Sequence, residues 1–267
     1  MSTLYVVPTP IGNLKDITLR AKEVLCKVDT ILCEDTRVMR KLLSLLRIDT
    51  SGKRLIPYFD HNEREKYKDV VNLLLNGVDI ALVSDAGMPV LNDPGFLLIR
   101  EIRRMQMRTE LVKSSKISKG SDSVSAKRSA EDVKMPDSSS IKIEVLPGPD
   151  SITTALVASG FPADRFTFLG YLPRKPSDRQ KLFKSALRSN QHIKATFIAF
   201  ETKHRLLSSL QSMEKYLGKN LKIALCRELT KMHESIEIGT LREIIDIVEK
   251  GKSDLRGEIV IVFNVNV

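Results

Sequence analysis

Residues 4–13, LYVVPTPIGN, indicate the fold class, because a short β-branched run passes directly into a turn rich in proline and glycine. The same order of features returns at residues 29–37 (DTILCEDTR), 80–89 (IALVSDAGMP) and 143–151 (IEVLPGPDS). Each of these four segments is typical of a strand that ends in a polar loop. Together they predict four strands with chemically similar loops at equivalent ends.

Helical patterns lie between these strands, with apolar residues on one stripe at residues 17–27 and 64–75. Strand, loop, helix and strand in succession are typical of a parallel α/β sheet. In such sheets the ligand binds at the carboxyl ends of the strands. Proline and glycine also punctuate turns in any α/β protein, but four polar loops at equivalent ends favour one ligand site.

The middle of the chain divides it into two predicted domains. Residues 107–143 contain ten serines and no aromatic residue, so we predict a disordered insertion there, inside an N-terminal α/β domain of residues 1–149. The second half repeats the strand and helix pattern more weakly, which predicts a second α/β domain of residues 150–267. Its expected strands are 196–200, 221–225 and 259–263, and its expected helices include 204–216 and 241–250.

The charge balance points to a polyanionic partner. Lys and Arg number 43 against 33 Asp and Glu, a net charge of +10. Only 5% of residues are aromatic and none is Trp, which argues against recognition by stacked aromatic rings. No apolar stretch is long enough to cross a bilayer, and the start lacks a signal-peptide pattern. We therefore expect a protein of the cytosol or of an organelle matrix, without a membrane partner.

The cysteines and histidines predict neither disulfides nor a metal. Cys26, Cys33 and Cys226 form no CxxC pair and are odd in number. The four histidines are scattered along the chain. We therefore expect no metal site.

The loops also lack the glycine spacing of known phosphate cradles. Neither GxGxxG nor GxxxxGK occurs, and the first loop has a single glycine, Gly12. This favours a ligand without phosphates, held by backbone groups on tight loops.

Nine short motifs spread over both halves carry a family resemblance. They are TPIGNL (9–14), DITLRA (16–21), EDTR (34–37), SDAGMP (84–89), DPG (93–95), PGP (147–149), GYLPRK (170–175), FETKHRLL (200–207) and RELTKMHE (227–234). In this order they strongly resemble the 16S ribosomal RNA cytidine 2′-O-methyltransferase family of the tetrapyrrole methylase superfamily. The family loop usually has Thr where Met88 stands here, and Asp150 precedes Ser151 where the family often goes directly to Ser.

The resemblance implies two α/β domains, S-adenosyl-L-methionine bound in the cleft between them, and a homodimer. Members of the family methylate the ribose 2′-hydroxyl of a cytidine in small-subunit ribosomal RNA. Carried over by position, the cofactor-binding residues are Pro10, Ser84, Asp85, Gly87, Met88, Pro89, Ser151, Ile152 and Cys226.

Methyl transfer to a hydroxyl depends mainly on alignment, but a carboxylate that accepts the proton would help. The candidates are Glu201, which we favour, and Asp35, with Asp85 as a third. Asp35 and Asp85 are equally compatible with helix capping or loop bracing.

Basic side chains gather beside the same loops. The expected RNA-binding residues are Arg37, Arg40, Arg174, Lys175, Arg227 and Lys231. For Arg179 and Lys181, a solvated helix face is an equally good interpretation.

The leading hypothesis is an S-adenosylmethionine-dependent methyltransferase that acts on small-subunit ribosomal RNA or a ribosomal subunit. One alternative is a methylase of a small tetrapyrrole, which would need one pocket for an acidic substrate and no dispersed basic patches. A second alternative is an RNA-binding assembly factor that has the fold and no catalytic activity.

Overall fold

The computed structural model describes residues 1–117, 141–251 and 257–265. The chain forms two compact units. Unit 1 consists of Met1–Pro10 and Leu14–Pro149, and unit 2 of Ile11–Asn13 and Asp150–Val267. The division therefore differs from the expected boundary after residue 149 in one respect, because the three residues Ile11–Asn13 pack with the second half.

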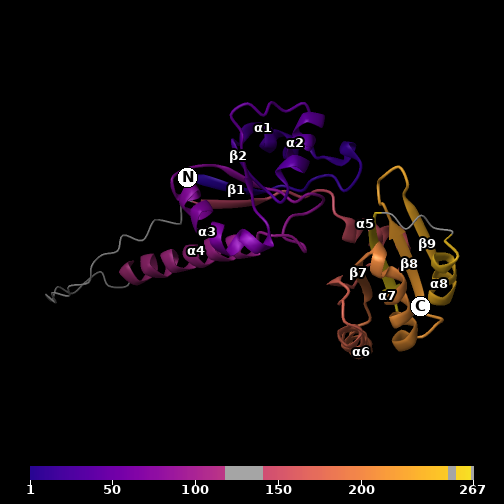
Figure 1. Ribbon diagram of the computed structural model, residues 1–267. Helices are drawn as coiled ribbons and strands as arrows, with labels where there is room; N and C mark the ends of the chain where they lie inside the picture. The colour runs from indigo at the N-terminus through magenta and orange to yellow at the C-terminus, as the bar shows by residue number, and fades with distance from the viewer. Residues whose placement is uncertain (118–140, 252–256, 266–267) are drawn as a thin grey trace. The chain divides into compact units, whose positions relative to one another are not determined.

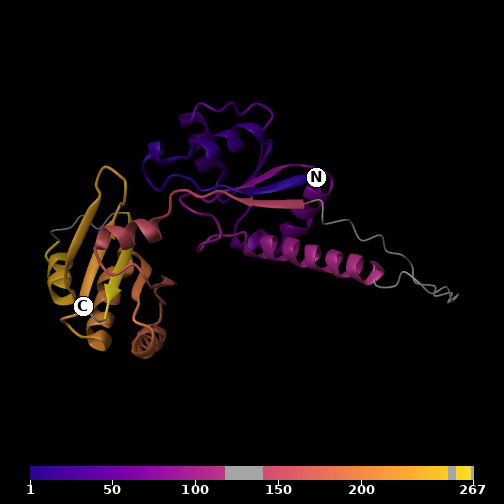
Figure 2. The ribbon, with the colours of Figure 1, turned by 180° about the vertical axis from the view of Figure 1, so that it is seen from behind.

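Unit 1 contains a five-stranded parallel sheet with the strand order β3-β2-β4-β1-β5. Figure 2 shows β5 running beside β1, as the pairing of Ser2 with Ile141 requires. All five strands run in the same direction, so their carboxyl ends lie at one edge of the sheet. The strands are β1 (Ser2–Val6), β2 (Thr30–Cys33), β3 (Arg54–Pro57), β4 (Ile80–Leu82) and β5 (Ile141–Val145).

Helices cover both faces of this sheet (Figure 1). Alternate residues of each strand point to opposite faces, so Tyr5 packs with α1 and α2 while Leu4 packs with α3 and α4. The helices are α1 (Leu19–Lys27), α2 (Thr36–Leu45), α3 (Asp60–Leu75) and α4 (Phe96–Ile117), with a 3₁₀ turn, η1, at Leu14–Asp16.

The predicted disordered insertion at 107–143 is wrong at both ends. Helix α4 continues into this segment as far as Ile117, because Met, Arg, Glu and Leu at residues 107–111 are good helix formers. At the other end, β5 begins at Ile141, where it pairs with β1. Residues 118–140 lie outside the described residues.

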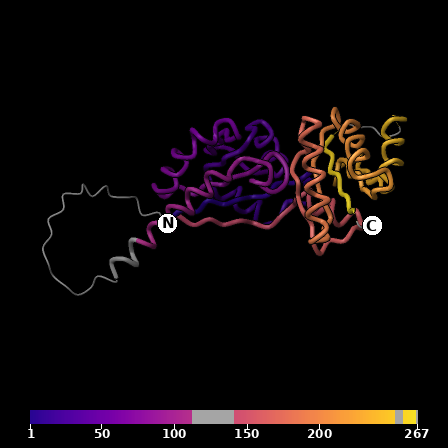
Figure 3. The backbone as a smooth tube through the Cα atoms, turned by 90° about the horizontal axis from the view of Figure 1, so that it is seen from below, coloured from indigo at the N-terminus to yellow at the C-terminus, as the bar shows by residue number. Residues whose placement is uncertain are grey.

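Unit 2 is also an α/β unit, as expected, but its sheet is mixed. The order is β6-β7-β10-β8-β9, in which β6 and β7 are parallel and the other neighbours antiparallel. In Figure 3 the last strand, in yellow, lies among earlier segments in orange. The strands are β6 (Phe166–Tyr171), β7 (Thr196–Thr202), β8 (Lys222–Arg227), β9 (Ser235–Thr240) and β10 (Glu258–Asn264).

The two faces of this second sheet bury separate apolar clusters. Helix α5 (Ser151–Ser159) packs on one face, together with Ile11. The opposite face is covered by α6 (Pro176–His192), α7 (Lys203–Leu217) and α8 (Leu241–Glu249). The face to which a strand residue points therefore decides which helices it can contact.

Candidate functional site

The loops that follow β1 and β4 are tied together at the carboxyl edge of the first sheet. Thr9 and Gly87 exchange two backbone hydrogen bonds, of 2.9 Å and 3.0 Å. The Thr9 hydroxyl donates to the carbonyl oxygen of Ser84 at 3.1 Å, and the Ser84 hydroxyl donates to that of Gly87 at 3.1 Å. Gly87 has a φ of +85°, which favours glycine at this position. The structure thus brings together Ser84, Gly87 and the residue that precedes Pro10.

The loop that follows β5 joins this pair through close backbone approach. A Cβ atom added to Gly148 would lie 2.8 Å from the Cβ of Pro8. Only a residue without a side chain fits there. The prediction that polar loops share one edge of a parallel sheet is confirmed for unit 1, because β1, β2, β4 and β5 lie side by side.

Acidic side chains occupy the same edge, after β2 and β4. Oδ1 of Asp85 accepts a hydrogen bond from the backbone N–H of Asp35 at 3.2 Å. The backbone N–H of Asp85 in turn donates a hydrogen bond to Oε1 of Glu34 at 3.4 Å. Desolvation raises the pKa of both Glu34 and Asp85. Burial, together with the nearby Glu34 carboxylate, raises the pKa of Asp93 to about 7.

Asp35 differs from these three carboxylates. It is the N-cap of α2, where its side chain accepts a hydrogen bond from the backbone N–H of Arg37 at 2.8 Å. The guanidinium of Arg37 also pairs with it, at 2.6 Å. Hydrogen bonds from Arg37 lower the pKa of Asp35 to about 2, so this carboxylate is a weak proton acceptor.

Of the basic residues expected in unit 1, Arg37 and Arg40 both follow β2 on α2 and both are exposed. The side chain of Arg37 is 86% exposed even though it pairs with Asp35. Its guanidinium therefore has open sides that face solvent.

In unit 2, Ile152 and Cys226 lie in one apolar cluster on the α5 face, together with Ile11. Burial raises the pKa of the Cys226 thiol to about 12. Ser151 is the first residue of α5, and Asp150 is its N-cap, accepting hydrogen bonds from the backbone N–H groups of Ile152 and Thr153. Asp150, which departs from the family motif, is thus explained by helix capping.

Glu201 points to the other face of the same sheet. Its neighbour Phe200 packs on the α5 face with Cys226, so Glu201 faces α7. Oε1 accepts from the guanidinium of Arg205 at 2.7 Å and from the backbone N–H of Thr202 at 2.7 Å, and Oε2 accepts from the Ser209 hydroxyl at 2.5 Å. The residue is only 1% exposed. The structure therefore does not bring together Glu201, the favoured proton acceptor, and Cys226, an expected cofactor-binding residue.

The basic residues expected in unit 2 divide into two groups. Arg174 and Lys175 are exposed in the loop before α6. Arg227 is only 7% exposed, because it lies on β8, which is flanked by a strand on each side. Its guanidinium donates a hydrogen bond to the Ser235 hydroxyl at 2.6 Å. Lys231 pairs with Glu228 at 3.0 Å and with Glu258 at 3.3 Å.

Two arginines, Arg179 and Arg205, contact the loop that carries Arg174, and the sequence did not predict this packing. Arg179 is 4% exposed, against the alternative that it belongs to a solvated helix face. Arg205 pairs with Glu201 and contacts the same loop. A sequence signal for these contacts is the group of three serines on α7, Ser208, Ser209 and Ser212. Ser208 and Ser212 accept hydrogen bonds from Arg179, and Ser209 donates one to Glu201.

Two kinds of feature are absent from the described parts of the chain. Within residues 1–117, 141–251 and 257–265, no group of three or more His, Cys, Asp or Glu side chains is arranged to hold a metal ion. No helix in those same ranges is long and apolar enough to cross a membrane.

The two-unit fold and its loops match a known family. The family model described as Tetrapyrrole (Corrin/Porphyrin) Methylases matches residues 3–113 and 130–245, and the chain belongs to this family. The crystal structure of the methyltransferase CobJ has the same fold, with a TM-score of 0.63, 16% identity, and coverage of 99% of this chain and 94% of that chain.

Curated relatives narrow the comparison within that family. The "Ribosomal RNA small subunit methyltransferase I" of Vibrio cholerae is 39% identical over 97% of this chain and 75% of the relative. The protein of the same name from Hydrogenobaculum sp. is 37% identical over 98% of this chain and 95% of the relative. The resemblance predicted from the motifs is confirmed, and the chain is a methyltransferase.

Proposed function

We propose that this methyltransferase uses S-adenosyl-L-methionine to methylate the ribose 2′-hydroxyl of a cytidine in small-subunit ribosomal RNA. The observation that carries the proposal is the identity of 37–39% across nearly the whole chain to relatives named as small-subunit ribosomal RNA methyltransferases. The exposed Arg174 and Lys175 support it, because paired basic side chains in a loop suit a phosphate backbone.

The tied loops of unit 1 fit the proposed cofactor chemically. They offer backbone donors and acceptors around Ser84 and Gly87, and the exposed carboxylate of Asp85 can accept from hydroxyl or amino groups. They lack the glycine-rich backbone of a phosphate cradle, and S-adenosylmethionine has no phosphate. We propose Pro10, Met88 and Pro89 as further contacts of this edge, while Ser151, Ile152 and Cys226 remain predictions.

When bound, the cofactor supplies a methyl group on a sulfonium centre. The contribution of the protein is then mainly to align the ribose hydroxyl with that group. Glu201 is committed to three donors, and Asp35 has a pKa of about 2. We therefore assign proton acceptance to neither carboxylate and attribute the rate chiefly to alignment.

Mass spectrometry of ribosomal RNA nucleosides tests the proposed reaction. Small-subunit RNA from cells that lack the protein should gain 2′-O-methylcytidine when it is incubated with the purified protein and S-adenosylmethionine. No gain with either naked RNA or assembled subunits as substrate would contradict the proposal.

The two alternatives predict different results. An assembly factor without activity would bind RNA but show no calorimetric binding of S-adenosylmethionine. A tetrapyrrole methylase would transfer the methyl group to a porphyrinogen and leave the RNA unmodified. The dispersed basic side chains, Arg37 and Arg40 in unit 1 and Arg174 and Lys175 in unit 2, favour RNA over a single small acidic substrate. A homodimer remains a prediction that sedimentation equilibrium would check.

A further inference from the structure

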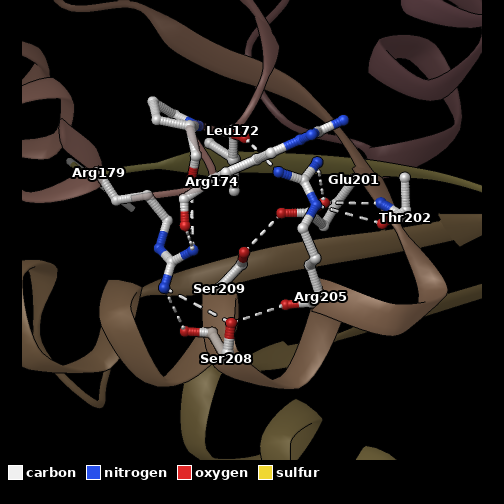
Figure 4. Close-up of polar contacts among 9 residues, drawn as sticks. Leu172, Arg174, Arg179, Glu201, Thr202, Arg205, Ser208 and Ser209 are labelled. Atoms are coloured by element: carbon white, nitrogen blue, oxygen red, sulfur yellow. Dashed lines mark hydrogen bonds and ion pairs between the residues drawn. The ribbon is translucent and has the colours of Figure 1, made fainter. Parts of the chain in front are cut away.

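A buried arginine supports the loop that carries Arg174 and Lys175. Arg179 projects from the first turn of α6, and its Nη1 donates to the carbonyl oxygens of Pro173 at 3.3 Å and of Arg174 at 3.1 Å (Figure 4). Its Nε donates to the hydroxyl of Ser212 on α7 at 3.2 Å. One guanidinium thus joins the loop to two helices.

A second arginine holds the residue before Pro173. Nη1 of Arg205 donates to the carbonyl oxygen of Leu172 at 3.0 Å, while its Nη2 pairs with Glu201. The Ser209 hydroxyl holds the other oxygen of the Glu201 carboxylate. Figure 4 shows this chain of contacts from Ser209 through Glu201 and Arg205 to Leu172.

Three consecutive carbonyl groups, at residues 172 to 174, therefore accept hydrogen bonds from two arginines. Burying a guanidinium or a carboxylate costs desolvation energy. Apolar side chains of similar volume often stabilise a fold at least as much as a buried ion pair does. What the planar guanidinium adds is a set of donors in fixed directions. The arrangement orients the backbone immediately before Lys175, with both exposed basic side chains at its end.

We propose that Glu201, Arg205 and Arg179 are positioning residues for RNA binding. They fix the backbone of residues 172–174, so that Arg174 and Lys175 meet the phosphates of the substrate in one orientation. Glu201 acts through Arg205 and does not accept a proton from the ribose. This inference rests on the proposed function, because it takes RNA as the substrate.

Hydrogen exchange of the loop tests the support itself, independently of the substrate. Arg179→Met removes the donors and keeps an unbranched apolar stem. In this variant the amides of Leu172 and Asp178, which donate to the carbonyl oxygens of Phe200 and Lys175 on either side of the loop, should exchange about tenfold faster. The control is Lys181→Met, which removes the same charge from the exposed side of the same helix. Unchanged exchange in Arg179→Met would overturn the proposal.

Steady-state kinetics test the role of the support in RNA binding. Arg179→Met should raise KM for ribosomal RNA about tenfold, with kcat and the affinity for S-adenosylmethionine unchanged. Arg179→Lys keeps the charge but not the planar donors, so it should fall between the wild type and Arg179→Met. Faster exchange of the loop without any change in KM would overturn the positioning role.

Glu201→Gln separates positioning from proton acceptance. The amide keeps the shape of the side chain and loses the charge that pairs with Arg205, so we expect a higher KM with the wild-type pH dependence of kcat. The loss of a general base would instead lower the turnover rate by about 100-fold or more. A fall of that size with KM unchanged would overturn the proposal. If Glu201→Gln does not fold, Arg205→Lys tests the same link with the same two readouts.

A failure of the proposed function would look different from a failure of the support. If Arg174→Ala with Lys175→Ala left KM for RNA unchanged, the RNA contact itself would be overturned, whatever the exchange rates of the loop. If that double variant raised KM but Arg179→Met did not, only the positioning role would be overturned.

Discussion

The backbone N–H of Asp35 donates a hydrogen bond to Oδ1 of Asp85 at 3.2 Å, which links the end of β2 to the loop after β4. Asp35 is 50 residues away from Asp85 in the sequence, and the two meet because β2 and β4 are neighbours in a parallel sheet. This hydrogen bond holds one oxygen of Asp85 and so orients the carboxylate, while the side chain remains exposed. Asp85 is fixed and accessible, as a ligand-binding group requires.

Replacing Asp85 with Asn should weaken S-adenosylmethionine binding about tenfold, because the amide keeps the contact with Asp35 but offers a neutral acceptor in place of a charged one. Isothermal titration calorimetry measures the change. Glu65→Gln is the matched control, since it removes one negative charge from an exposed position on α3. Wild-type affinity in Asp85→Asn would show that Asp85 only braces the loop.

The raised pKa of Asp93 predicts how stability depends on pH. Its folded pKa is about 7, whereas an unfolded Asp titrates near about 3.9. Between these values the folded protein keeps a proton that the unfolded chain has released, so the free energy of unfolding falls as pH rises from about 4 to 7.

Asp93→Asn should remove this dependence. Relative to the variant, the wild type should lose about 1 kcal/mol between pH 5 and pH 7, after allowance for solvent screening. Urea unfolding at pH 5, 6, 7 and 8 measures the difference. Parallel curves for the two proteins would mean that Asp93 is ionised in the folded state.

Removing Arg174 and Lys175 together should weaken RNA binding and reduce its dependence on salt. If each contacts one phosphate of a single strand, the slope of log K against log salt concentration should fall by about 1.4 in magnitude. The matched control is Lys184→Ala with Arg188→Ala, which removes two exposed positive charges further along α6. An equal effect in both double variants would indicate attraction by overall charge, without a defined phosphate site.

Gly12→Ala should destabilise unit 2, because a Cβ atom there would lie 2.4 Å from Cγ of Lys231 and 2.7 Å from Oγ1 of Thr230. The backbone N–H of Asn13 also donates to that same Thr230 oxygen at 3.0 Å. Overpacking of this kind costs about 2 kcal/mol. The midpoint of urea unfolding, followed by circular dichroism, measures the effect, and an unchanged midpoint would show that the segment moves aside freely.

The three cysteines should differ in reactivity towards iodoacetamide. Burial raises the pKa of Cys33 and of Cys226 to about 12, whereas Cys26 is exposed. Because the thiolate is the reacting form, intact-mass spectrometry of the folded protein should show one alkyl group, on Cys26. Rapid labelling of Cys226 would mean that the α5 face opens.

The first sheet could be predicted from sequence because its signals are local. Each of β1, β2, β4 and β5 is a short β-branched run that ends in a polar loop, so the strands and their shared edge followed from the pattern. The strand β3 was not predicted, since Arg54–Pro57 is half-exposed at the edge of the sheet and its apolar run is limited to Leu55 and Ile56. The serine content of residues 107–143 predicts too short an α4, whose last turns contain good helix formers.

The sequence predicted the residues of the candidate site, but it did not predict the directions in which their side chains point. The motifs place Glu201 and Cys226 near the ends of two strands, but only the pairing of β7 and β8 with β10 shows that the two side chains face opposite sides of the sheet. Likewise, no local pattern distinguishes the buried Arg179 from the exposed Lys181 two positions later. Both distinctions depend on tertiary packing, which a single sequence does not encode in its local pattern.

The membership of Ile11–Asn13 in unit 2 has a consequence for dissecting the gene. A fragment of residues 1–149 would include Ile11, which belongs to the apolar cluster on the α5 face of unit 2. A fragment of residues 150–267 would lack Ile11 and would expose that part of the cluster to water. The first half of the polypeptide contains all of unit 1, whereas the second half lacks part of unit 2. Co-expressing the halves should therefore rescue the solubility of the second one, by supplying Ile11 from a separate chain.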